Sequence, residues 1–131
     1  MASFDATESG VSTAAFSTNP STNWIRTRKN TKLNNQVTFL LDVVAGTSTY
    51  FTFTIDVSND GSTPYPVQTF SGLGSAADPA VGQDMTYRIN LSGNAKVAVN
   101  MPANCDYIRL NFSDSGGNGT ITVTGSKGDH R

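Results

Sequence analysis

Residues 36–57, with the sequence QVTFLLDVVAGTSTYFTFTIDV, decide the fold of this chain. In the second half of this stretch, large apolar side chains alternate with Thr and Asp from Phe51 to Val57. A period of two is typical of a strand with one face on the core and the other in water. The first half, residues 36–44, predicts another strand, and Gly46 lies in the turn between the two. Asp42 and Asp56 are expected on the solvated faces.

A second pair of strands is expected at residues 85–91 and 95–101, where apolar residues again alternate. Their apolar faces coincide if the strands form a hairpin closed by the three residues 92–94. The last residue of such a loop adopts a left-handed conformation, which Asn94 tolerates. The same phase places Tyr87 in the core.

The last pair of strands is expected at residues 107–112 and 120–124, joined by the Gly/Ser loop 113–119. Between the central strands and these pairs, two prolines flank a short edge strand that ends at Phe70. Residues 71–84 are rich in Gly and Ala and predict a long loop.

Composition restricts the fold class. Ser, Thr, Asn and Gly make up about two-fifths of the 131 residues, Glu occurs once, and strand-forming residues are plentiful. This excludes a helical bundle and a coiled coil and argues strongly against an α/β enzyme fold. Seven or eight short antiparallel strands with turns every eight to twelve residues predict a single all-β sandwich, jelly-roll-like.

The expected organisation has three parts. Residues 1–34 are polar with isolated apolar positions, so we expect an extended N-terminal arm with one or two short strands. Residues 35–125 form the β-sandwich domain. Residues 126–131 are a polar tail.

Catalytic and metal chemistry lack candidates in the sequence. The only histidine, His130, lies in the polar tail, and Cys105 has no histidine that could activate it. With one histidine and one cysteine, the chain has too few ligands for a metal site of the His/Cys type. The aspartates could supply a carboxylate pair, but solvated aspartates are the ordinary case, so a small catalytic sandwich is disfavoured. We predict no catalytic residues, no metal and no cofactor.

Charge argues against nucleic acid as a partner. The formal net charge is −1, whereas dedicated nucleic-acid binders are usually basic. One basic cluster, between Arg26 and Lys32, could grip an acidic surface or could be a solvated strand end. The first residues show neither a signal peptide nor a membrane span, so we expect synthesis in a cytosol and no membrane contact.

Two segments resemble small β-sandwich structural proteins of tailed bacteriophage particles. Residues 53–67, FTIDVSNDGSTPYPV, match a strand that runs into Ser-Asn-Asp-Gly and then an aromatic residue. Residues 106–123, DYIRLNFSDSGGNGTITV, are similar to the closing hairpin of those proteins. Together they cover about a quarter of the chain. The matching residues are Ser58, Asn59, Asp60, Gly61, Tyr65, Tyr107, Ile108, Arg109 and Leu110. The resemblance implies a virion structural protein, without catalytic residues, displayed on a capsid or a tail.

Our first functional hypothesis is a capsid decoration (cement) protein that binds and stabilises the phage head shell. Its partners would be the major capsid protein and sister subunits in a homo-oligomer, for which a trimer is suitable. The N-terminal arm would make these contacts, because aromatic anchors tend to dominate interface energy. The candidate interface residues are Phe4, Phe16, Trp24, Arg26, Arg28, Lys29 and Lys32.

The alternative is a carbohydrate- or receptor-binding sandwich module of a phage tail or a host protein. A glycan would then stack on tyrosine rings. This hypothesis predicts that Tyr50, Tyr65 or Tyr107 is exposed on one face.

Overall fold

The computed structural model describes residues 2–4, 11–29, 32–33, 36–72, 74–102 and 105–128. This part of the chain is all-β, with antiparallel strands and a single short 3₁₀ turn, η1 (Phe16–Thr18). The strands form two large sheets and two small two-stranded ribbons.

The first large sheet, called the β6 sheet, has the order β1-β14-β6-β12, and β2 also pairs with β14. Its strands are β1 (Ala2–Phe4), β2 (Val11–Ala15), β6 (Gln36–Val44), β12 (Ala95–Pro102) and β14 (Thr120–Gly128).

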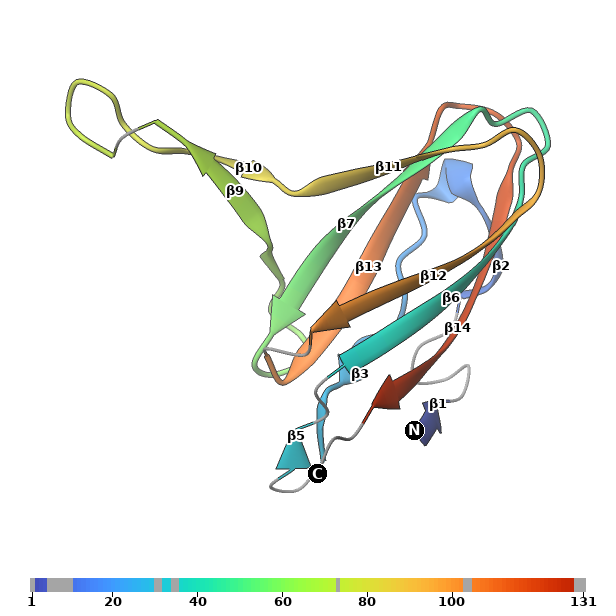
Figure 1. Cartoon of the computed structure of the whole chain (residues 1–131), viewed down its shortest axis with the longest axis horizontal. Coiled ribbons are helices and arrows are strands. Elements are labelled where there is room, and N and C mark those ends of the chain that lie inside the picture. Colours follow the sequence, from blue (N-terminus) through green and yellow to red (C-terminus); the bar gives the residue numbers. More distant parts are fainter. Residues whose placement is uncertain are drawn as a thin grey trace.

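The second, the β7 sheet, has the order β11-β7-β13-β3, and β8 also pairs with β7. Its strands are β3 (Ile25–Arg26), β7 (Tyr50–Ser58), β8 (Tyr65–Pro66), β11 (Thr86–Asn90) and β13 (Tyr107–Asp114). The two sheets face one another, as a β-sandwich requires (Figure 1).

Inward-facing side chains of the central strands form the core between the sheets. The alternation predicted for β7 is confirmed, since its inner-face residues from Phe51 to Ile55 are buried. The buried residues of the four central strands are Val37, Phe39, Leu41, Val43, Phe51, Phe53, Ile55, Ile108, Leu110, Phe112, Ile121 and Val123. Each fully buried side chain of this size stabilises the fold by about 1.5–3 kcal/mol.

The two predicted C-terminal hairpins are wrong in their pairing. β11 pairs with β7 and β12 pairs with β6, so the chain crosses from one sheet to the other between them. β13 and β14 are likewise in different sheets, as are β6 and β7. Alternation shows which side chains face inward, and the two inward faces meet across the core rather than along a ladder of hydrogen bonds.

The crossing loops at one end of the sandwich hold each other in place. The backbone N–H of Thr47 donates to the side-chain oxygen of Asn118 at 2.7 Å. The N–H of Ala45 donates to the side-chain oxygen of Asn94 at 3.1 Å. Gly117 packs so closely that an added Cβ would clash with a backbone nitrogen of the 45–49 loop. These contacts join all three connections, so this end of the molecule is rigidly closed.

A β-ribbon replaces the long loop expected at residues 71–84. β9 (Gln68–Ser71) and β10 (Val81–Asp84) pair with each other and project from the edge of the β7 sheet (Figure 1). All eight residues of the ribbon are exposed. Neither face of this ribbon packs on the sandwich. Its residues therefore do not alternate between apolar and polar, and the pattern that would predict a strand is missing.

The N-terminal segment, for which an extended arm with one or two short strands was expected, pairs with both sheets. β2 pairs with β14, and β3 pairs with β13. Phe16 is 0% exposed and stacks on Phe51 with ring centroids 5.4 Å apart, and Ile25 is also buried. Residues 13–27 therefore close one side of the sandwich. A small ribbon, β4 (Arg28–Lys29) with β5 (Lys32–Leu33), follows β3 in this segment.

Candidate docking surface

Exposed apolar side chains lie on and beside the projecting ribbon. From here on, "the arm" means this ribbon (residues 68–84), and residues 1–34 are called the N-terminal segment. Phe70 and Val81 on the arm are 69% and 58% exposed. Tyr65 on β8 and Tyr87 on β11, the two strands at its base, are 57% and 43% exposed. Exposed apolar groups concentrated in one region are typical of a surface that binds another protein.

The two strands of the arm contact each other across the ribbon. Phe70 is opposite Gly82 in the register, and the ring lies over the glycine, where an added Cβ would be 3.0 Å from the ring. The amide of Gln68 donates to Asp84 at 2.9 Å across the ribbon. An isolated two-stranded ribbon is only marginally stable in water, so a partner would stabilise the arm considerably.

A cleft of about 390 Å³ opens next to the base of the arm, between β11 and β12. These are edge strands: in the part of the chain that the structure describes, β11 pairs only with β7 and β12 only with β6. The lining is largely apolar and includes Phe53, Tyr87, Ile89, Val97, Val99 and Met101. Apolar walls beside unpaired strand edges are features that a further strand could cover.

The prediction that Tyr87 is a core residue is wrong. Its ring does lie on the inner side, opposite Phe53 in the register and stacked on it at 5.1 Å. It is nevertheless 43% exposed, because it lies in the wall of the cleft and no strand among the described residues covers it.

Charge is distributed unevenly around the cleft. Residues 33–87 contain no Lys or Arg, and the arm carries Asp78 and Asp84. Arg88, on β11, contributes to the cleft lining. Its guanidinium lies 3.7 Å from the centroid of the Tyr50 ring, and its Nε donates to Asn90 at 3.0 Å. The register pairs Arg88 with Thr52, so its side chain lies on the outer face of the β7 sheet, beside the cleft rather than inside it. Arg88 has no carboxylate partner among the described residues, so its charge at the rim can still attract one.

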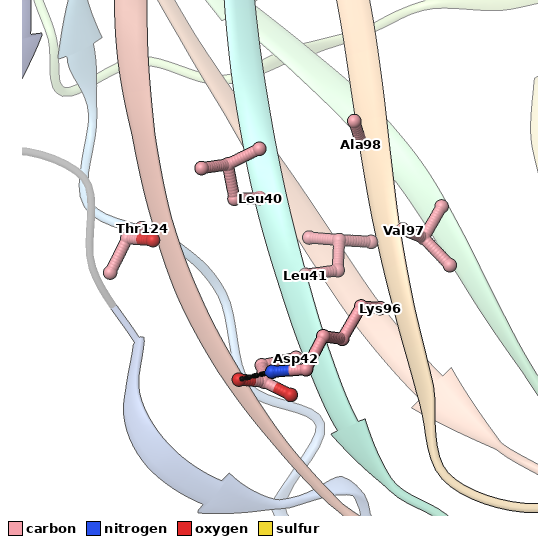
Figure 2. A pocket seen from close by; sticks show the side chains of 7 residues that line it. All are labelled: Leu40, Leu41, Asp42, Lys96, Val97, Ala98 and Thr124. Atoms are coloured by element: carbon pink, nitrogen blue, oxygen red, sulfur yellow. Dashed lines mark hydrogen bonds and ion pairs between the residues drawn. The ribbon is translucent and has the colours of Figure 1, made fainter.

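A second groove, of about 380 Å³, crosses the outer face of the β6 sheet (Figure 2). Asp42 and Lys96 form an exposed ion pair at 3.1 Å at one end of it, which confirms that Asp42 is solvated. Leu40, Ala98 and Thr124 also line the groove and lie to one side of this pair. One acid and one base that neutralise each other offer little chemistry, so we do not assign this groove a function.

The expectation that Asp56 is solvated is wrong. Asp56 is 7% exposed and accepts hydrogen bonds from Nε of Arg109 at 3.0 Å and from the amide of Asn111 at 2.9 Å. Asn111 in turn accepts a hydrogen bond from Ser21, and the Arg109 guanidinium lies 4.4 Å from the ring centroid of Trp24. The N-terminal segment therefore covers this outer face, which alternation within β7 could not reveal.

The proposed interface residues of the N-terminal segment lie in different environments. Phe16 is fully buried, so it anchors the segment to its own sandwich and is unavailable to a partner. Trp24 is half-buried, and Arg26 is exposed. For the others the structure describes only the backbone, with Phe4 in β1, Arg28 and Lys29 in β4, and Lys32 in β5.

The Ser-Asn-Asp-Gly phrase at residues 58–61 forms a tight turn after β7. The backbone N–H groups of Thr63 and Ser62 both donate to Asp60 at 2.8 Å, and the hydroxyl of Ser58 donates to it at 2.9 Å. These hydrogen bonds, led by that from Thr63, hold the pKa of the Asp60 carboxyl well below its usual range. Gly61 takes a φ of +72° there. The phrase thus has a structural role in this chain.

Among the described residues, no three His, Cys, Asp or Glu side chains lie close enough together to hold a metal ion. Cys105 is half-buried and free, and His130 lies outside the described residues. Among those residues no helix is long and apolar enough to cross a membrane. Comparison with protein-family models, curated proteins and solved structures gives no match.

The arm and the cleft are the features that sequence reasoning missed. The available signal was small: Phe70 and Val81 are large apolar residues on either side of a Gly/Ala-rich stretch, at the spacing of a ribbon.

Proposed function

We propose that this chain is a non-enzymatic structural protein of a phage virion, a capsid decoration protein that binds and stabilises the head shell. The observation that carries the proposal of an assembling structural protein is the exposure of Tyr65, Phe70, Val81 and Tyr87 on the arm and its base. A projecting, largely unsupported element with exposed apolar side chains suits assembly with other proteins. The proposed place of action is the outer surface of the capsid.

A jelly-roll order of strands belongs to the same proposal. We number the eight principal strands 1 to 8 in chain order, as β2, β3, β6, β7, β11, β12, β13 and β14. The β6 sheet then has the order 1-8-3-6 and the β7 sheet has the order 2-7-4-5. This supports a jelly roll, an architecture found in viral capsid and lectin domains. Because one fold hosts many functions, the order supports the proposal without deciding it.

The shell contact is assigned to the basic N-terminal segment. Arg26 is exposed on the edge strand β3, and three further basic residues follow it by position 32. A basic edge suits an acidic patch on the major capsid protein, since complementary charge mainly increases the rate and specificity of association. The arm, at a separate place on the sandwich, is left for contacts with sister subunits.

Co-sedimentation of the purified protein with empty phage shells tests this proposal. We expect it to pellet in a fixed ratio to coat protein and Arg26→Glu to weaken binding at least several-fold. Lys96→Glu, an exposed charge reversal on the outer face of the β6 sheet, is the matched control and should bind normally. A wild-type protein that stays in the supernatant at low salt would overturn the proposal.

The alternative, a carbohydrate-binding module, is supported by Tyr65 alone of the three tyrosines named for it. Tyr50 lies under Arg88, and Tyr107 is half-buried and packs against Gly61. If the protein ignores shells, a glycan array is the next measurement. Binding that Tyr65→Ala abolishes would favour the alternative.

A further inference from the structure

We propose that the arm of one copy docks in the β11–β12 cleft of a second copy, so that subunits join head to tail. The inference rests on the proposed role as an assembling structural protein and names the two surfaces that meet. It assigns the apolar side chains of the arm and the unpaired edges of the cleft to one interface.

The arm cannot fill the cleft of its own subunit. Its base is fixed where the N–H of Val67 donates to the carbonyl of Ile55, and the N–H of Met85 donates to the carbonyl of Val67, both at 2.9 Å. From there the arm extends away from both sheets (Figure 1). Any arm that enters the cleft must therefore come from another molecule.

The shapes of the two elements correspond. The cleft lies between two edge strands, and β12 offers an edge of eight residues, against four residues in each strand of the arm. Ribbon addition to a free strand edge is a common mode of recognition, in which backbone hydrogen bonds give affinity. Phe70 and Val81 belong to adjacent cross-strand pairs and so point to opposite faces of the ribbon. An inserted ribbon could thus present an apolar side chain to each wall.

Charge favours the head-to-tail arrangement over contact between two arms. Each arm carries Asp78 and Asp84 and no basic residue, so two arms side by side would repel each other. Arg88, whose side chain lies on the outer face of β11 at the rim of the cleft, is the first basic residue after Lys32 and lacks a carboxylate partner in the described part of the chain. A contact between two different surfaces repeats from copy to copy and closes into a ring when the rotation allows it.

Light scattering of the full chain tests the inference, with each variant first checked for folding by circular dichroism. We expect the wild type to form a closed oligomer. We expect Phe70→Asp on the arm and Arg88→Asp at the rim of the cleft each to give monomers. Leu40→Asp, an exposed apolar change on the outer face of the β6 sheet, is the control and should leave the oligomer intact.

A mixing experiment then identifies the two surfaces. Phe70→Asp retains an intact cleft and Arg88→Asp retains an intact arm, so an equimolar mixture should form dimers although neither variant does so alone. The inference is overturned by a wild type that stays monomeric at high micromolar concentration, by oligomers that survive both changes, or by a mixture that remains monomeric.

The outcomes for this inference and for the proposed function are distinguishable. Phe70→Asp monomers that still pellet with shells would leave shell binding independent of the arm. Wild-type oligomers that depend on the arm but ignore shells would support the arm contact and remove the decoration role.

Discussion

The two sides of the sandwich close the same core in different ways. On one side Phe16 stacks on Phe51 and is completely buried. On the other side Tyr87 stacks on Phe53, two residues further along β7, and stays 43% exposed. The first side is closed by residues 13–27 of the chain itself, whereas the second lacks a covering strand in the described residues. The comparison shows that the apolar side chains of the open side could be buried as fully as Phe16 only if a further chain segment covered them.

Replacing the two aromatic rings tests this comparison most strongly. Phe16→Ala should lower the free energy of unfolding by about 3–5 kcal/mol, because it removes a fully buried ring and leaves a cavity. Tyr87→Ala should cost only about 1 kcal/mol, since much of that ring is in water in the single chain. Urea denaturation of both variants, at a concentration where the protein is monomeric, measures the difference. Equal losses would contradict the distinction between a closed and an open side.

Two ion pairs sharpen the comparison on the outer faces of the sheets. Asp56→Ala should cost about 2–4 kcal/mol, because Arg109 and Asn111 lose a partner beneath the N-terminal segment. Asp42→Ala, which removes the exposed pair with Lys96, should cost less than about 1 kcal/mol. Thermal unfolding with each variant in the same buffer gives the ranking. A large loss for Asp42→Ala would indicate that something also covers the outer face of the β6 sheet.

Two loop glycines give the smallest expected contrast. Gly117→Ala should cost about 1–3 kcal/mol, because its new methyl group meets the backbone of the 45–49 loop. Gly93, in the loop between β11 and β12, has open space around the position of an added Cβ. Gly93→Ala should therefore change stability by less than about 0.5 kcal/mol. Urea midpoints of the two variants would decide, and a larger shift for Gly93→Ala would contradict the closed packing of this end.

The positions of the core strands could be predicted from the sequence, but strand partners and the strand β10 of the arm could not. The predicted strand at residues 36–44 coincides with β6, and the inward faces of β7 and β13 are as predicted. Alternation encodes which face a side chain lies on, and that is why Tyr87 has the predicted face without the predicted burial. The ion pair of Asp56 with Arg109 depends on a register between strands some fifty residues apart, for which the sequence carries no local signal.

Pairing of β6 with β14 constrains the order in which the chain can fold. The ladder joins residues 36–44 to residues 120–128, and the other neighbour of β6, β12, is also distant in sequence. Such non-local pairing requires the closure of long loops, which makes folding slow. Until residues 120–128 have been synthesised, one edge of β6 lacks its native partner and can pair with another nascent chain. The arm, whose two strands are close in sequence, can form early, so the element proposed for assembly is available before the β6 sheet is complete.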